Sequence, residues 1–167
     1  MKIISRNSGF FLLSILVALA DQLTKAWVMA NFAPFESRVI IPGFFDLIYV
    51  TNTGAAFGFL AGEPAWWRQF FFCGLALVAL LVLFFTYRQV RTRSRLLALA
   101  IGLIGGGAMG NLIDRLRFGA VVDFLDFYVG RYHWPAFNVA DSAITIGVAL
   151  FLFGSLRQPR QGVSGKG

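Results

Sequence analysis

The sequence is poor in the residues that build metal centres and disulfides. Its 167 residues include one cysteine, Cys73, and one histidine, His133. A single cysteine excludes an intramolecular disulfide, and because Cys73 lies inside an apolar run we expect a packing residue rather than a nucleophile. Zinc sites typically combine several histidine or cysteine ligands, so no metal site is predicted. His133, between Tyr132 and Trp134, is expected to be a surface residue of an interfacial loop.

The same scarcity disfavours several kinds of catalysis. A serine–histidine pair would have to use the one histidine, and the Gly-x-Ser-x-Gly turn of many serine hydrolases does not occur. Glycine loops that bind phosphates or dinucleotides would need a lysine or a strand–turn–helix context that is missing here. The sequence therefore predicts no cofactor and leaves carboxylates as the main catalytic candidates.

Charged residues are also scarce, at 14% of the chain, whereas 57% of the residues are hydrophobic and the mean hydropathy is +0.70. A soluble domain has about 25% charged residues, so this chain has too few to cover its apolar material. Four apolar runs, at about 9–30, 66–87, 96–116 and 137–156, approach the roughly 20 residues that span a bilayer. The predicted fold class is an all-α integral membrane protein, with residues 1–167 forming a single membrane domain.

The net charge of +7 predicts an orientation rather than a nucleic-acid partner. Nine of the fifteen basic residues cluster before the first run, between the second and third, and after the fourth, and no acidic residue lies in these segments. Four crossings place the three segments on one side, and the positive-inside rule makes that side, with both termini, cytoplasmic. Contact with anionic lipid head groups is expected, and a nucleic-acid partner is not. The nine basic residues of these three segments are Lys2, Arg6, Arg88, Arg91, Arg93, Arg95, Arg157, Arg160 and Lys166.

The N-terminus has a second interpretation. Residues 1–7 are basic, an apolar stretch follows, and Ala18-Leu19-Ala20 before Asp21 matches a signal-peptidase site. The apolar character nevertheless resumes through residues 26–30, so the whole segment has spanning length. This favours a first span that is retained over one that is cleaved.

The two outer connections are predicted at about residues 31–65 and 117–136. In the first, the aromatic and β-branched residues 44–50 predict a strand, a turn at Asn52-Thr53-Gly54 follows, and residues 57–60 predict a second strand. We expect a small amphipathic β-sheet cradle over residues 31–65, lying on the outer membrane surface. The alternative is an interfacial loop anchored in an aromatic belt by Phe44, Phe45, Trp66 and Trp67.

Glycines recur every four residues in the third run, at Gly102, Gly106 and Gly110. Small residues at this spacing let helix backbones approach closely in lipid. The next position in the series is Asp114, and Asn111 lies on the same face three residues before it. The packed face therefore leads to a polar cluster at the outer end of the helix. A monomer is expected, because packing within one bundle would use this face.

Three carboxylates, Asp114, Asp123 and Asp141, map near the outer interface from separate segments. Ionisable groups at the edge of the hydrocarbon are functional candidates. Two such groups can share one proton, so that the ionised member activates water while the protonated member polarises the scissile carbonyl. Such a pair hydrolyses amides without a metal. Asn111 and Asn138, each three residues before an aspartate, could hold a substrate backbone.

The charged pairs can also be interpreted as purely structural. Asp114 stands beside Arg115 and can form a structural ion pair or anchor a loop. Asp21 and Lys25 are four residues apart, which is the spacing of a salt bridge within one helix. These interpretations need no chemistry.

The other two aspartates have alternatives as well. Asp141 can favour the positive N-terminus of the fourth helix, and Asp123 can lie in a plain loop where Asp126 competes with it. Spacing alone is compatible with a carboxylate pair but does not select it.

Five segments of this chain, in order and suitably spaced, resemble the motifs of the lipoprotein signal peptidase family, also called signal peptidase II. The resemblance covers essentially the whole chain, and five motifs together are far more specific than any one. The segments are Asp21-Gln22-Leu23-Thr24-Lys25, Asn52-Thr53-Gly54-Ala55-Ala56-Phe57, Gly110-Asn111-Leu112-Ile113-Asp114-Arg115, Val121-Val122-Asp123-Phe124 and Phe137-Asn138-Val139-Ala140-Asp141-Ser142.

The resemblance implies an aspartyl endopeptidase of the bacterial inner membrane, with four transmembrane helices, a small extracytoplasmic β-sheet cradle and an active site that faces the periplasm. Its substrates would be prolipoproteins that carry diacylglycerol on a cysteine, cut just before that cysteine. No cofactor is implied. The first span would be retained.

Carried over to this chain, the family motifs imply a catalytic pair and two supporting groups. The pair would be Asp123 and Asp141. The substrate-binding residues would be Asn52, Gly54, Asn111, Arg115 and Asn138, with structural support from Asp114, Asp21 and Lys25.

Two non-enzymatic classes remain as alternatives. A proton-coupled carrier could relay protons through Asp21, Asp114 and Asp141, but a relay needs polar groups through the thickness of the membrane. The second run and the inner halves of the third and fourth lack them. A structural subunit of a membrane assembly would use the glycine face equally well, yet neither class explains why acids and amides gather at one outer surface.

Overall fold

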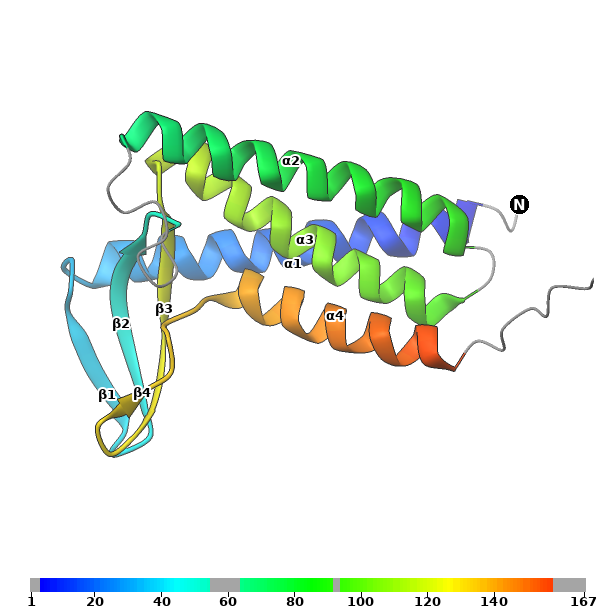
Figure 1. The fold of residues 1–167 in the computed structure, drawn as a ribbon. Coiled ribbons are helices and arrows are strands. Elements are labelled where there is room, and N and C mark those ends of the chain that lie inside the picture. The colour runs from blue at the N-terminus through cyan, green and yellow to red at the C-terminus, as the bar shows by residue number, and fades with distance from the viewer. Residues whose placement is uncertain (1–3, 55–63, 92–93, 158–167) are drawn as a thin grey trace, which may run out of the picture.

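A computed structural model describes residues 4–54, 64–91 and 94–157. Within these residues four long helices lie side by side, and a small sheet crosses one end of them (Figure 1). All four are long and apolar enough to cross a membrane. The predicted class, an α-helical membrane protein with a small sheet, is therefore confirmed. The helices are α1 (Ile4–Asn31), α2 (Ala65–Val90), α3 (Arg95–Phe118) and α4 (Val139–Leu156).

Helix α3 is the centre of the bundle, and α1, α2 and α4 all pack against it. A methyl group on Gly106 would lie 2.7 Å from the carbonyl oxygen of Ser14 on α1, and one on Gly107 would collide with the carbonyl oxygen of Ala140 on α4. A methyl on Gly110 would meet the carboxylate of Asp21. The predicted close packing along this helix is confirmed, since its glycines admit the backbones of two neighbours.

The sheet has four antiparallel strands in the order β1-β2-β3-β4. The predicted strand at residues 44–50 corresponds to β2, whereas the one predicted at residues 57–60 lies outside the described residues. Half of the strands come from the second outer connection, for which the sequence analysis predicted no strand. The strands are β1 (Ser37–Ile41), β2 (Phe45–Asn52), β3 (Val121–Val129) and β4 (Tyr132–His133).

The sheet rests on the outer end of α1. Val28 and Phe32, at the end of that helix, are buried together with Phe124 of β3. Leu47 and Leu125 pack around this cluster. This apolar cluster between the end of α1 and strands β2 and β3 holds the sheet against the bundle.

The chain enters β3 through a sharp turn after α3. Gly119 ends the helix with φ of +71°, a left-handed conformation that glycine adopts without a Cβ penalty, and its N–H donates to the carbonyl oxygen of Arg115. The chain then runs back across the end of the bundle, where β2 pairs Val50 with Asp123. Asp123 is thereby brought over the ends of α3 and α4.

We predict that Gly107→Ala lowers the stability of the protein by about 1–3 kcal/mol, since overpacking against a backbone atom forces the helices apart. Thermal unfolding in detergent would measure the change. Gly74→Ala on α2 is the matched control, because a methyl there meets nothing within 4 Å. Equal unfolding temperatures for the two variants would contradict tight packing between α3 and α4.

Candidate active site

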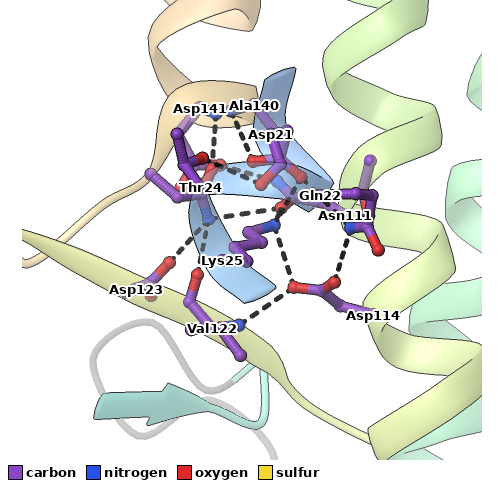
Figure 2. Close-up of polar contacts among 12 residues, drawn as sticks. Asp21, Gln22, Thr24, Lys25, Asn111, Asp114, Val122, Asp123, Ala140 and Asp141 are labelled. Atoms are coloured by element: carbon purple, nitrogen blue, oxygen red, sulfur yellow. Dashed lines mark hydrogen bonds and ion pairs between the residues drawn. The ribbon is translucent and has the colours of Figure 1, made fainter. Parts of the chain in front are cut away.

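The side chain of Lys25 lies at the centre of a polar cluster where α1, α3, α4 and β3 meet (Figure 2). The side chain is 1% exposed, and its ammonium group contacts three oxygens: Asp21 Oδ2 at 2.8 Å, Asp114 Oδ2 at 2.8 Å and Asn111 Oδ1 at 3.0 Å. An ammonium group has three N–H donors, so every donor of Lys25 has a partner within the protein.

The two carboxylates that pair with Lys25 also bind backbone groups of other elements. Asp21 Oδ1 accepts a hydrogen bond from the N–H of Ala140, at the start of α4, at 2.9 Å. Asp114 Oδ2 accepts one from the N–H of Val122, in β3, at 3.1 Å. A single buried ion cluster thus joins α1 and α3 to the segments that carry Asp141 and Asp123.

The expected pairing of Asp21 with Lys25 is present, but it is buried and belongs to a larger cluster. Asp114 pairs with Lys25 and not with its neighbour Arg115. Successive residues of a helix point in different directions, and the guanidinium of Arg115 turns back to donate to the carbonyl oxygen of Asn111 at 3.2 Å. Asp114 therefore serves both as an ion-pair partner and as the anchor of β3.

Two buried amides connect Asp123 with Asp141. Asn111 Nδ2 donates to Asp141 Oδ1 at 2.7 Å, and Asn138 Nδ2 donates to Asp123 Oδ1 at 2.7 Å. The amides also touch each other, since Asn138 Nδ2 lies 3.3 Å from Asn111 Oδ1. The two aspartates, which are 18 positions apart in the sequence, are held by one hydrogen-bonded network.

Asn138 also begins α4. Its side-chain oxygen accepts a hydrogen bond from the N–H of Asp141 at 2.9 Å and so caps the helix. Asp141 is in the first turn, where the helix dipole favours a negative charge. The helix-terminus interpretation of Asp141 is therefore correct, and it places the carboxylate inside the polar site rather than apart from it.

The carboxyl group of Asp123 is buried, with 2% of the residue exposed. Burial and, second, the nearby charge of Asp141 together raise its pKa to about 7. Hydrogen bonds from Asn138 and Asn52 oppose the shift. Near neutral pH, Asp123 thus retains a proton in a substantial fraction of molecules.

The rim of the site is built by residues of β2, the following turn, α2 and α3. Asn52 Oδ1 accepts a hydrogen bond from the N–H of Gly54 at 2.8 Å, and Gly54 has φ of +96°. A Cβ at Gly54 would collide with the ring of Phe72 on α2. The guanidinium of Arg115 lies 5.5 Å from the centre of the same ring and interacts electrostatically with Asp141 and Asp123. All five predicted substrate-binding residues therefore contact the aspartates or adjoin the groups that do.

A cleft of about 380 Å³ opens beside Asp141 on the surface of α4. Its walls are mostly apolar, and Trp134 and Ile146 are exposed along it. Asp141 is the one acidic residue among its lining residues, so the cleft reaches this carboxylate from the side of α4. The lining residues are Trp134, Pro135, Ala136, Phe137, Asp141, Ser142, Thr145 and Ile146.

Asp126 does not compete with Asp123 for the site. Residues three apart in a strand point to opposite faces, and Asp126 instead lies 2.9 Å from Nδ1 of His133, which is half exposed as expected. No group of three or more metal-binding side chains occurs in the parts of the chain that the structure describes.

Comparisons with known proteins converge on one family. The family described as "Signal peptidase (SPase) II" matches residues 13–157. Among curated proteins, the lipoprotein signal peptidase of Syntrophus aciditrophicus is 45% identical over 152 residues, covering 91% of this chain and 94% of that protein. The one from Cupriavidus taiwanensis is 49% identical over 149 residues, covering 89% and 82%.

Solved structures agree with the sequence comparisons. A bacterial membrane enzyme determined at 2.3 Å resolution is similar with a TM-score of 0.78 and 30% identity, over 96% of this chain and 94% of that one. A second, at 1.9 Å resolution, has a TM-score of 0.77 and 32% identity, over 91% and 95%.

We predict that Lys25→Met destabilises the protein by about 3–5 kcal/mol, because two buried carboxylates lose their common counter-ion. Thermal or denaturant unfolding in detergent would measure the loss. Adding Asp21→Asn should recover part of it by removing one uncompensated charge. Arg95→Met, at an exposed cation, is the control. If Lys25→Met unfolds like Arg95→Met, the cluster does not hold the bundle together.

Proposed function

The chain belongs to the signal peptidase II family, and from this premise we propose that Asp123 and Asp141 are its catalytic pair. The enzyme is an aspartyl endopeptidase that removes signal peptides from prolipoproteins in the bacterial inner membrane. The proposal for the residues depends on one observation: two aspartates from different elements share one amide network, and burial holds the pKa of one of them near 7.

In the proposed mechanism Asp123 begins as the acid and Asp141 as the base. Asp141 takes a proton from a water molecule as the oxygen of that water attacks the scissile carbonyl carbon, while Asp123 donates its proton to the carbonyl oxygen. The carbon–nitrogen bond then breaks, and the leaving amine takes the proton that Asp141 received. Asp123 recovers its own proton as the carbonyl re-forms. The dyad thus returns to its starting state.

The surroundings of the two groups support this division. Asp123 is the more buried, which raises its pKa and suits the acid, whereas Asp141 is half-buried in the first turn of α4 and accepts an amide hydrogen bond. Because the two carboxylates interact, the apparent pKa values belong to the pair.

The remaining site residues would hold the substrate and the dyad. Asn111 and Asn138 already donate to the two carboxylates, and neutral amides leave the shared proton undisturbed. Asn52, Gly54 and Arg115 would bind the peptide backbone of the segment to be cut. Asp21, Lys25 and Asp114 would position α4 and β3 without touching the substrate.

The proposed substrate is a prolipoprotein with diacylglycerol on a cysteine, cut just before that cysteine. Its acyl chains and apolar signal peptide would approach from the lipid along the cleft beside Asp141, and the sheet would cover the peptide from the outer side. No cofactor is needed for this hydrolysis. The scissile bond would reach water at the interface while the acyl chains stay in the hydrocarbon.

The orientation follows from the basic residues. Arg88 is in the last turn of α2 and Arg95 begins α3. These helix ends lie opposite the sheet, as do the start of α1 and the end of α4 (Figure 1). The positive-inside rule then places both termini in the cytoplasm and the sheet in the periplasm. We propose a monomer in contact with membrane lipids, since α1 and α4 already occupy the glycines of α3.

Replacing either proposed catalytic group should remove activity. Asp123→Asn and Asp141→Asn are each expected to slow cleavage of a lipidated precursor at least about 100-fold, as general acid–base groups contribute this much or more. Asp126→Asn, in the same strand as Asp123, is the matched control and should cleave normally. A precursor without the lipid tests substrate choice. Cleavage by Asp141→Asn near the rate of the unmodified enzyme would exclude it from the dyad.

The Asp123→Asn variant should also be at least as stable as the unmodified protein. A carboxyl whose pKa is raised by folding destabilises the folded state at every pH above its unfolded value, and the neutral amide avoids this penalty. Unfolding temperature at pH 7.5 is the measurement. A clear decrease would show that the inactive variant is misfolded rather than chemically impaired.

The rate of cleavage should fall as the pH rises through about 7, because Asp123 then loses the proton that it donates. Asn52→Leu removes a hydrogen bond that lowers the pKa of Asp123, so the alkaline limb of its pH–rate profile should move to higher pH. Asn31→Leu, whose amide donates only to the end of α1, is the control. Identical limbs in both variants, or a rate that rises through pH 7, would contradict the assignment.

A further inference from the structure

A second cavity lies on the other side of α3 from the cleft beside Asp141. It is a groove of about 400 Å³ between α1, α2 and α3, and it does not include either aspartate. Its walls are almost entirely apolar, and Ile15, Ala18, Leu19, Leu80, Met109 and Ile113 contribute to them. Both α1 and α2 pack on α3, and the groove is the space left between them.

The inner end of the groove is closed. Phe10 of α1 stacks on Tyr87 of α2 with ring centroids 3.9 Å apart, and both residues are buried. This contact joins the two helices near Arg88, at the end of the bundle away from the sheet. An occupant can therefore enter only from the membrane side or from the outer end.

The outer end of the groove has a cation. Gln22 lines the groove, and its side-chain oxygen accepts a hydrogen bond from the guanidinium of Arg117 at 3.3 Å. Arg117 is exposed in the last turn of α3, and it makes no ion pair with any carboxylate in residues 4–54, 64–91 and 94–157. A positive charge thus stands at the mouth of an apolar groove.

The length of the groove matches one leaflet of a bilayer. Its lining on α1 runs from Phe10 to Gln22, which is about 18 Å at the rise of an α-helix. Half of the hydrocarbon thickness is about 15 Å. The groove is therefore as long as one acyl chain that enters from the outer leaflet.

We propose that this groove binds a phospholipid of the outer leaflet, with one acyl chain between α1 and α2 and its phosphate on Arg117. An ordinary boundary lipid meets a convex helix surface, whereas this one meets three helices, a closed inner end and a complementary charge. The bound chain fills the gap between α1 and α2 and so stabilises the position of α2. The site is separate from the catalytic pair and does not depend on the proposed reaction.

The test is native mass spectrometry of the full-length protein in detergent, titrated with phosphatidylglycerol. The unmodified protein is expected to bind one lipid before any others. Ala18→Trp and Ile15→Trp fill the groove and should weaken this first binding at least tenfold. Val78→Trp adds the same bulk to an exposed position of α2 outside the groove and should bind as the unmodified protein does.

Arg117→Gln tests the contact with the phosphate separately from the contact with the acyl chain. It should weaken binding of phosphatidylglycerol about fivefold, as expected for one cation at a membrane surface, and leave diacylglycerol with the same chains unaffected. An equal loss for both lipids would overturn the phosphate contact.

Unchanged first binding in the groove-filling variants would overturn the site. Ile15 is exposed, so tryptophan there can be accepted without repacking. If Ala18→Trp does not fold, the result with Ile15→Trp decides the test. Displacement of the bound lipid by a lipidated precursor, one molecule for one, would assign the groove to the substrate instead and would also overturn the proposal.

Discussion

The buried ammonium group of Lys25 is the interaction on which the outer end of this bundle depends. Its three acceptors are Asp21, Asp114 and Asn111, and each of them makes a further bond to a segment that carries an aspartate of the site. Asp21 binds the start of α4, Asp114 binds β3, and Asn111 binds the carboxylate of Asp141. Burying an ion cluster costs free energy that an apolar core would not. The benefit here is position, because each partner of the lysine sets the place of a different element.

Burial also determines the chemistry of the site. Asp123 lies on a strand that crosses the ends of the helices, where burial raises its pKa, while Asp141 stands at a helix N-terminus that favours its charge. The glycines of α3 contribute by letting α1 and α4 approach, which brings Asp21 within reach of Ala140. Between α1, α2 and α3, beside the stack of Phe10 on Tyr87, an apolar groove remains.

The helices and most of the polar residues were predicted from the sequence, whereas strand β3 and the ion-pair partner of Asp114 were not. Residues 121–129 are rich in β-branched and aromatic side chains, a pattern typical of a strand, yet no strand was predicted there and a plain loop was one interpretation of Asp123. Asp114 was expected to pair with its neighbour Arg115 or to anchor a loop; the anchor is present, at β3, but the ion pair is not, since proximity in sequence is visible and proximity in space is not. The partner of Asp114 is Lys25, which is 89 positions away. Asp126 was a rival of Asp123 until pairing with β2 placed the two on opposite faces of one strand.

The amino-acid sequence by itself determined that the chain enters a membrane, how many times the described part can cross it, and which residue types are available for chemistry. Hydrophobic runs and basic segments act locally, through transfer of each segment from water to lipid, so they can be recognised without a fold. Which carboxylates share one network was decided only by the tertiary structure. The amides of Asn111 and Asn138 join Asp123 to Asp141 because β3 folds back over the bundle and the partners of Lys25 connect α1 and α3 to β3 and α4, segments that lie far apart in the sequence.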